Sequence, residues 1–90
     1  MSKIIFTRES KFDLEEIKNY IWQDNPVIAK KVIDIIINLI INLSTFPKLW
    51  HTVAWTNYRE IIEPMYNYSI RYEIIDNVIY IIAIYKFKNI

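Results

Sequence analysis

Residues 66–74, which read YNYSIRYEI, decide the fold of this chain. Tyr and Ile occupy every second position, and Asn, Ser, Arg and Glu lie between them. Because successive side chains of a β-strand point to opposite faces, this alternation predicts a strand with one buried face and one face in water. One solvated face is typical of antiparallel sheets, in which only the other face packs on a core.

Two further strands flank this segment. Residues 58–62 predict a strand that leads through a short turn into the alternating strand, for which the pattern predicts residues 65–75. Asp76 and Asn77 predict a two-residue hairpin turn, since both residue types tolerate positive φ. Residues 78–85 are almost continuously apolar, which predicts a central strand buried on both faces.

The first half of the chain predicts a short strand and two helices. The strand covers residues 3–7, and the helices cover about residues 9–24 and 26–44. Apolar residues recur at helical spacing in both helical segments. In the second helix they form a broad stripe, which indicates a helix that is covered on two sides; the alternative is that one edge of the stripe binds another chain.

The helix starts carry recognisable signals. Either Thr7 or Ser10 caps the first helix, because a hydroxyl oxygen can accept from a free amide of the first turn. Asn25 is a good cap for the second helix, and Pro26 fits its first position. A connection this short between two helices predicts an antiparallel helical hairpin.

The order of elements is therefore β-α-α-β-β-β, and the predicted class is α+β, with an N-terminal helical hairpin packed on one face of an antiparallel sheet. Ninety residues predict a single domain over residues 1–90. The first residues become charged too early for a signal peptide, and the longest apolar run is far below the roughly 20 residues of a membrane span. We expect a cytoplasmic protein with no membrane segment.

Composition excludes several kinds of site. The chain has no cysteine, which excludes disulfides and thiolate metal sites, and no glycine, which excludes a glycine-rich phosphate loop. The sequence predicts no cofactor and no metal. The net charge is +1 and the isoelectric point is near 7.9, whereas dedicated nucleic-acid-binding domains usually lie above about 9. The charge balance therefore argues against a dedicated nucleic-acid binder.

The chain resembles the RelE/ParE superfamily, the toxin halves of type II toxin–antitoxin modules. The resemblance spans nearly the whole length, and its specificity lies in the order of several weak motifs. These motifs are Asp13-Leu14-Glu15-Glu16-Ile17, Asn25-Pro26, Leu43 followed by Phe46-Pro47, Arg59-Glu60-Ile61, Tyr68-Ser69-Ile70-Arg71-Tyr72 and the apolar strand Ile79 to Tyr85.

The departures from the family pattern bear on the target. RelE-type members, which cut ribosome-bound messenger RNA, carry a basic cluster and a tyrosine near the C-terminus. This chain has Tyr85-Lys86-Phe87-Lys88 and no arginine there. ParE-type members, whose known target is DNA gyrase, do not need that cluster. The resemblance therefore implies a ParE-like toxin with a cognate antitoxin; the alternatives are a RelE-like ribonuclease and a degenerate member that only binds its antitoxin.

The candidate site residues are few. RNA cleavage needs a proton acceptor, a proton donor and positive charge, and the candidates for these roles are Arg59, His51 and Lys86. For binding a target, the candidates are Arg59 and Arg71, taken to share the wet face of the sheet, with Lys86 and Lys88. A structural alternative is an ion pair between Arg71 and Glu60 or Glu73, and for Arg59 an ion pair with a glutamate of the sheet.

Large apolar side chains outside the expected core are the candidates for binding the antitoxin. They are Ile37 and Ile41 of the second helix and Trp50 and Trp55 of the segment that follows it. Because the chain is barely basic, we expect this contact to depend more on apolar burial than on charge.

Overall fold

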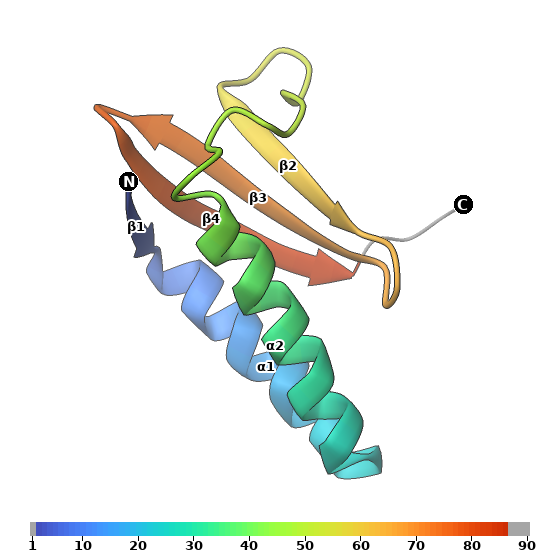
Figure 1. Cartoon of the computed structure of the whole chain (residues 1–90). Coiled ribbons are helices and arrows are strands. Elements are labelled where there is room, and N and C mark those ends of the chain that lie inside the picture. Colours follow the sequence, from blue (N-terminus) through green and yellow to red (C-terminus); the bar gives the residue numbers. More distant parts are fainter. Residues whose placement is uncertain (1, 87–90) are drawn as a thin grey trace.

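In the computed structural model, which describes residues 2–86, the chain forms two helices and four strands (Figure 1). In chain order these are β1 (Lys3–Phe6), α1 (Arg8–Asp24), α2 (Pro26–Asn42), β2 (Tyr58–Glu63), β3 (Tyr68–Ile75) and β4 (Val78–Lys86). The order and the α+β class are those that the sequence predicts. Within the described residues, neither helix is long and apolar enough to cross a membrane.

The sheet has the strand order β1-β4-β3-β2. β2, β3 and β4 pair in antiparallel fashion, as expected, whereas β1 pairs with β4 in parallel, so the sheet is mixed. β4 therefore lies between two strands, as predicted for a central strand. Its burial alternates, with Ile79, Ile81 and Ile84 buried and the residues between them only partly buried, so the expectation that both of its faces are buried is wrong. Figure 1 shows both helices on the same face of the sheet, with the tip of the helical hairpin extending beyond it.

The turns form without glycine. Asp76 and Asn77 have φ values of 50° and 64°, which confirms the predicted two-residue hairpin. The β2–β3 connection is longer than predicted, because the Glu63 carboxylate accepts from the backbone N–H groups of Met65 (2.6 Å) and Tyr66 (2.8 Å). These bonds hold Met65 and Tyr66 in the turn, so the expectation that the alternating strand begins at residue 65 is wrong.

Side-chain caps fix both helix starts. The Thr7 hydroxyl accepts from the Ser10 N–H (3.2 Å), which decides between the two predicted caps. The same hydroxyl donates to the Ile81 carbonyl (2.8 Å), so it ties the start of α1 to β4. The Asn25 side-chain oxygen accepts from the N–H groups of Val27 (3.1 Å) and Ile28 (3.2 Å), and caps α2 as predicted.

The core lies between the helices and the sheet. Alternate residues of the strands meet one stripe of α2 there. Ser10, in the first turn of α1, is also buried. The buried apolar cluster comprises Val32, Ile36, Ile40, Leu43, Ile61, Tyr68, Ile70, Tyr72, Ile79, Ile81 and Ile84. No helix covers the opposite face of the sheet in Figure 1, so that face carries the polar members of the alternation.

The Asn25 cap can be tested by substitution. Asn25→Ala removes the acceptor for two amides of the first turn of α2, so we expect the free energy of unfolding to fall by about 1 kcal/mol. Urea denaturation followed by circular dichroism measures the change. Asn38→Ala, at an exposed position within the same helix, is the matched control and should stay within about 0.5 kcal/mol of the parent. An equal loss in both variants would contradict the capping role.

Candidate functional site

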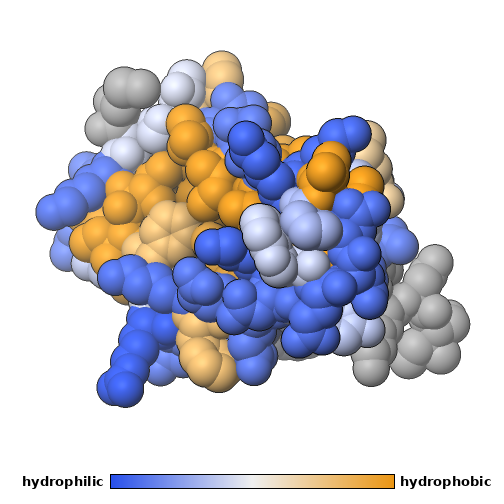
Figure 2. Space-filling model, turned by 90° about the horizontal axis from the view of Figure 1, so that it is seen from below, coloured by the Kyte–Doolittle hydropathy of each residue, from blue (hydrophilic) through white to orange (hydrophobic). Residues whose placement is uncertain are grey.

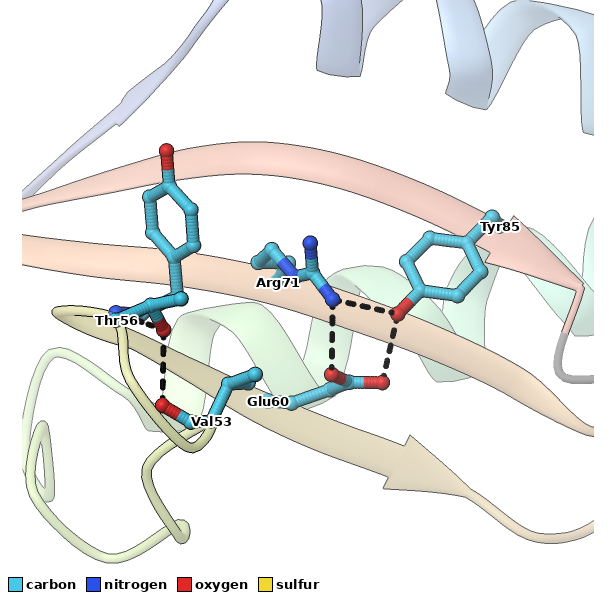
Figure 3. Close-up of polar contacts among 6 residues, drawn as sticks. Val53, Thr56, Glu60, Arg71 and Tyr85 are labelled. Carbon is cyan, nitrogen blue, oxygen red and sulfur yellow. Dashed lines mark hydrogen bonds and ion pairs between the residues drawn. The ribbon is translucent and has the colours of Figure 1, made fainter.

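Three polar side chains form a cluster on the open face of the sheet. One terminal nitrogen of Arg71, on β3, lies 3.5 Å from the Glu60 carboxylate of β2 and 3.3 Å from the Tyr85 hydroxyl of β4. The Tyr85 hydroxyl donates to the other Glu60 oxygen at 2.8 Å. Figure 3 shows these side chains standing on the strands, with the helices behind the sheet. The predicted pairing of Arg71 with Glu60 is confirmed.

Aromatic rings enclose the guanidinium group of Arg71. Its central carbon lies 5.6 Å from the centre of the Tyr58 ring and 5.8 Å from that of Tyr85, distances at which a cation is attracted to the ring. The Arg71 Nε is buried and has no hydrogen-bond partner among the described residues.

The cluster sets the ionisation of its members. Burial acts to raise the pKa of Glu60, but the hydrogen bond from Tyr85 and the charge of Arg71 outweigh it and hold the pKa below its ordinary value. Burial raises the pKa of Tyr85, and the neighbouring Glu60 carboxylate adds to this effect. At neutral pH Glu60 is therefore ionised and Tyr85 is a neutral donor. The charge of Arg71 is compensated by Glu60, which leaves it poorly suited to clamp a phosphate.

Tyr85→Phe tests this coupling. Removing the hydroxyl takes away a hydrogen bond to the ionised form, so we expect the pKa of Glu60 to rise toward its ordinary value of 4.5. A carboxyl whose pKa is lower in the folded state stabilises the fold fully above its unfolded pKa, and this contribution is lost as the pH falls through the folded pKa. The stability difference between parent and variant should therefore shrink below about pH 4.5.

The measurement is an NMR titration of the Glu60 carboxyl carbon together with urea denaturation at several pH values. Tyr80→Phe is the matched control, because Tyr80 lies on the same face, opposite Glu73, which is two residues from Arg71 along β3. It should leave the Glu60 titration unchanged. An unshifted Glu60 pKa in Tyr85→Phe would show that the hydroxyl does not act on the carboxylate.

Arg59 lies on the other face of the sheet, so the expectation that it shares a face with Arg71 is wrong. In the β2–β3 ladder Arg71 is opposite Glu60, whereas Arg59 is opposite the buried Tyr72. Neighbouring residues of one strand point to opposite faces, and only one of Arg59 and Glu60 can stand beside Arg71. Arg59 is not paired with a glutamate either: it donates to the carbonyls of Trp50 (2.7 Å) and, more weakly, Lys48 (3.4 Å).

The segment between α2 and β2 is tied down along its length. The Tyr72 hydroxyl donates to the Pro47 carbonyl at 2.8 Å, next to the two carbonyls held by Arg59. Further along, Thr52 pairs with Arg59 as an isolated antiparallel bridge. The Glu60 N–H then donates to the His51 carbonyl (3.2 Å), and the Val53 N–H to the Tyr58 carbonyl (2.8 Å). The segment is therefore an ordered extension of the sheet.

Arg59→Lys tests the anchoring role. One terminal nitrogen of the planar guanidinium donates to both carbonyls, whereas a lysine ammonium is a strongly hydrated charge on a flexible stem and should hold them less firmly. Since hydrogen bonds of charged groups contribute about 1.5–3 kcal/mol, we expect the free energy of unfolding to fall by about 1–2 kcal/mol. Urea denaturation measures it, and Arg8→Lys, at an exposed position, is the control that should change little. Equal stability of the two variants would show that the Arg59 side chain does not anchor the segment between α2 and β2.

The three catalytic candidates do not form one site, although His51 adjoins Thr52, the bridge partner of Arg59. His51 is exposed in the segment that precedes β2, and Lys86 lies at the other end of the sheet, in register with Tyr68. Lys86 Nζ donates to the Tyr66 carbonyl (2.8 Å) and lies 4.8 Å from the centre of the Tyr68 ring. Lys88 lies outside the described residues. Within residues 2–86, no group of three acidic, histidine or cysteine side chains is placed to hold a metal.

Lys86 borders a hollow in the described part of the molecule. This hollow measures about 680 Å³ and lies between α1 and the ends of β3 and β4. Its lining residues are Glu16, Ile17, Asn19, Tyr20, Gln23, Tyr68 and Lys86. The lining is mostly apolar or uncharged, so it does not form a basic channel for a nucleic-acid backbone.

The antitoxin-binding candidates fall into two groups. Ile37 and Trp50 are partly buried, and Trp50 packs against the core. Ile41 is 56% exposed and Trp55 is fully exposed (102%). The helical hairpin also exposes Phe12 and Trp22. Figure 2, seen from below, shows hydrophobic side chains gathered in a broad patch bordered by hydrophilic ones.

Sequence reasoning missed two features. The hydrogen bond from Tyr85 to Glu60 depends on the register between β4 and β2 across β3, which no local pattern gives. Trp55 has a φ of 66°, in the left-handed region that a tryptophan rarely adopts, and nothing in its neighbourhood contains the glycine that would signal such a turn.

Comparisons with known proteins find one matching family model and a solved structure of similar fold. A family model described as "ParE toxin of type II toxin-antitoxin system, parDE" matches residues 4–88. A chain from a structure described as the chromosomal ParDE toxin–antitoxin system from P. aeruginosa is similar in fold, with a TM-score of 0.85 and 18% identity, over 98% of each chain. No curated protein matches.

Proposed function

The chain belongs to the ParE toxin family of type II toxin–antitoxin systems, and from this premise we propose that it arrests growth by binding a cellular protein, with DNA gyrase as the expected target. We propose that it does so in the cytoplasm, as a single toxin domain over residues 1–90, and that a cognate antitoxin neutralises it. The observation that carries the proposal is the match of the ParE model to nearly the whole chain.

The state of the charged residues supports binding over RNA cleavage. Arg71 is paired with Glu60, and Arg59 is engaged with backbone carbonyls. His51 and Lys86 lie far apart along the sheet register, so these two candidates do not face one phosphate. In the cluster around Arg71, the Tyr85 hydroxyl already donates to the Glu60 carboxylate. Transesterification of RNA needs both groups close to a stabilising charge. A surface with compensated charges is better suited to a protein partner.

We propose that the antitoxin covers the exposed side of the helical hairpin, where Ile37 and Ile41 lie along one flank of α2. An amphipathic helix or an extended segment is the kind of partner that docks on such a surface. Apolar burial should supply most of the affinity, since the net charge of the chain is only +1.

Expression of the chain alone in bacteria, with and without the gene that adjoins it, tests the function. We expect growth arrest by the chain alone and rescue by co-expression, because the antitoxin holds the toxin inactive. Poisoning of gyrase predicts DNA breaks and a damage response with intact messenger RNA. Assays of chromosomal breaks and of transcript integrity, made on the same cultures, distinguish the two targets.

Rapid cuts in translated messenger RNA with intact DNA would contradict the proposed target and favour the RelE-like alternative. Absence of arrest by a well-folded, well-expressed chain would contradict a toxic activity altogether and favour a member that only binds its antitoxin. Equal arrest with and without the neighbouring gene product would contradict neutralisation by that partner.

A further inference from the structure

The most exposed large apolar side chain of the described residues belongs to Trp55, at the tip of the segment between α2 and β2. Its side chain is fully exposed, and it makes no contact that would contribute to the core. Figure 1 shows this segment projecting past the end of the sheet, opposite the tip of the helical hairpin. An exposed tryptophan contributes little to the stability of the fold, and tryptophan is a residue type that often dominates protein–protein contacts.

The backbone at Trp55 is held in an unfavourable conformation. Its φ of 66° places a bulky residue in the left-handed region, where Gly or Asn would be expected. Strained backbone of this kind persists only where the surroundings enforce it, and it is concentrated at binding and catalytic sites.

The surroundings do enforce it. The Thr56 hydroxyl donates to the Val53 carbonyl at 2.9 Å and accepts from the Tyr58 N–H at 3.1 Å (Figure 3). The Thr56 N–H also donates to the Val53 carbonyl (3.2 Å). The base of the turn is closed by the pairing of Thr52 with Arg59. The turn is thus fixed before any partner arrives, which lowers the entropy lost on binding.

Positive charge lies beside this turn. A hollow of about 620 Å³ adjoins it, with mostly polar lining residues: Lys48, Thr52, Thr56, Asn57, Arg59, Ile74, Asp76 and Asn77. Two cations and one carboxylate border the hollow, so the surroundings of the tip favour acidic groups on whatever binds there.

We propose that Trp55 is the anchor by which this chain engages its cellular target, entering an apolar pocket of a folded protein whose rim carries carboxylates. The inference rests on the proposed toxin function and names the part of the surface that carries it. Trp is the residue type most enriched among side chains that dominate protein–protein affinity, and such anchors fill fully desolvated pockets.

The shape of the Trp55 turn favours the cellular target over the antitoxin as its binding partner. A segment that docks as a helix or an added strand needs a groove or a sheet edge to receive it. The Trp55 turn projects from the sheet and is held by hydrogen bonds, so it suits a preformed cavity in a folded protein. Trp55 is therefore assigned to the target-binding surface, and the exposed side of the helical hairpin to the antitoxin.

Two variants of Trp55 test the proposal. Trp55→Ala removes the anchor, and Trp55→Asn removes it while placing at the turn a residue that tolerates positive φ. Trp22→Ala, which removes an exposed tryptophan from α1, is the matched control. Growth arrest is titrated against the amount of protein expressed, binding to the antitoxin is measured by co-purification, and the melting temperature of each variant is recorded.

We expect both Trp55 variants to need at least about 30-fold more protein for arrest, as for the loss of a dominant anchor. Antitoxin binding should be retained, and the melting temperature of Trp55→Asn should equal or exceed that of the parent because the strain is relieved. Trp22→Ala should arrest growth at the level of the parent.

Full arrest by Trp55→Ala would overturn the proposal, and so would loss of antitoxin binding in both Trp55 variants, which would assign the residue to the antitoxin. Quenching of tryptophan fluorescence by a single-stranded oligonucleotide that disappears in Trp55→Ala would also overturn it, in favour of base stacking. If the parent itself fails to arrest growth, the toxin function fails and the inference falls with it, an outcome distinct from an active Trp55→Ala protein.

Discussion

The cross-strand pair of Arg59 and Tyr72 holds the long connection between α2 and β2 against the sheet. The two residues are opposite each other in the β2–β3 ladder, and each reaches a backbone carbonyl in the segment 47–50. Tyr72 is fully buried, so its ring belongs to the core while its hydroxyl leaves the core to find Pro47. One pair thus joins the core, the sheet and the segment that leads to the Trp55 turn, and it adds side-chain anchors to the backbone hydrogen bonds that fix this turn.

The two faces of the sheet differ in what they can do. The face toward the helices carries the isoleucines of the alternation and gives the fold its stability through burial. The open face carries Arg71. Its guanidinium group forms an ion pair with Glu60 and lies against two aromatic rings. Both arginines that the sequence singles out make contacts within the molecule in the free chain. Trp55 makes none that contributes to the core and is fully exposed.

The sequence alone predicts the architecture well, because strong local signals agree with one another. The alternation of residues 68–74 fixes which side chains of β3 are buried, and Asn25-Pro26 marks the helix boundary where α2 begins. The sequence also predicts the pairing of Arg71 with Glu60. It does not predict the face of the sheet on which Arg59 lies, because Ile61 and Ile62 are both apolar and do not show which side chains of β2 point to the core. Only the register with β3 decides this. The parallel pairing of β1 is likewise a property of the assembled sheet, and the left-handed backbone of Trp55 follows from hydrogen bonds that local sequence does not reveal.

Hydrogen exchange of the backbone amides of Val53, Thr56 and Glu60 tests most directly whether the projecting segment is preformed. The account predicts that these three amides exchange slowly in the free protein, at rates set by opening of the β2–β3 pair, and that Arg59→Lys accelerates all of them together while leaving the amides of α1 unchanged. Exchange at the rate of an unstructured peptide in the parent protein would contradict it, because a turn that forms only on binding could not hold Trp55 in place beforehand.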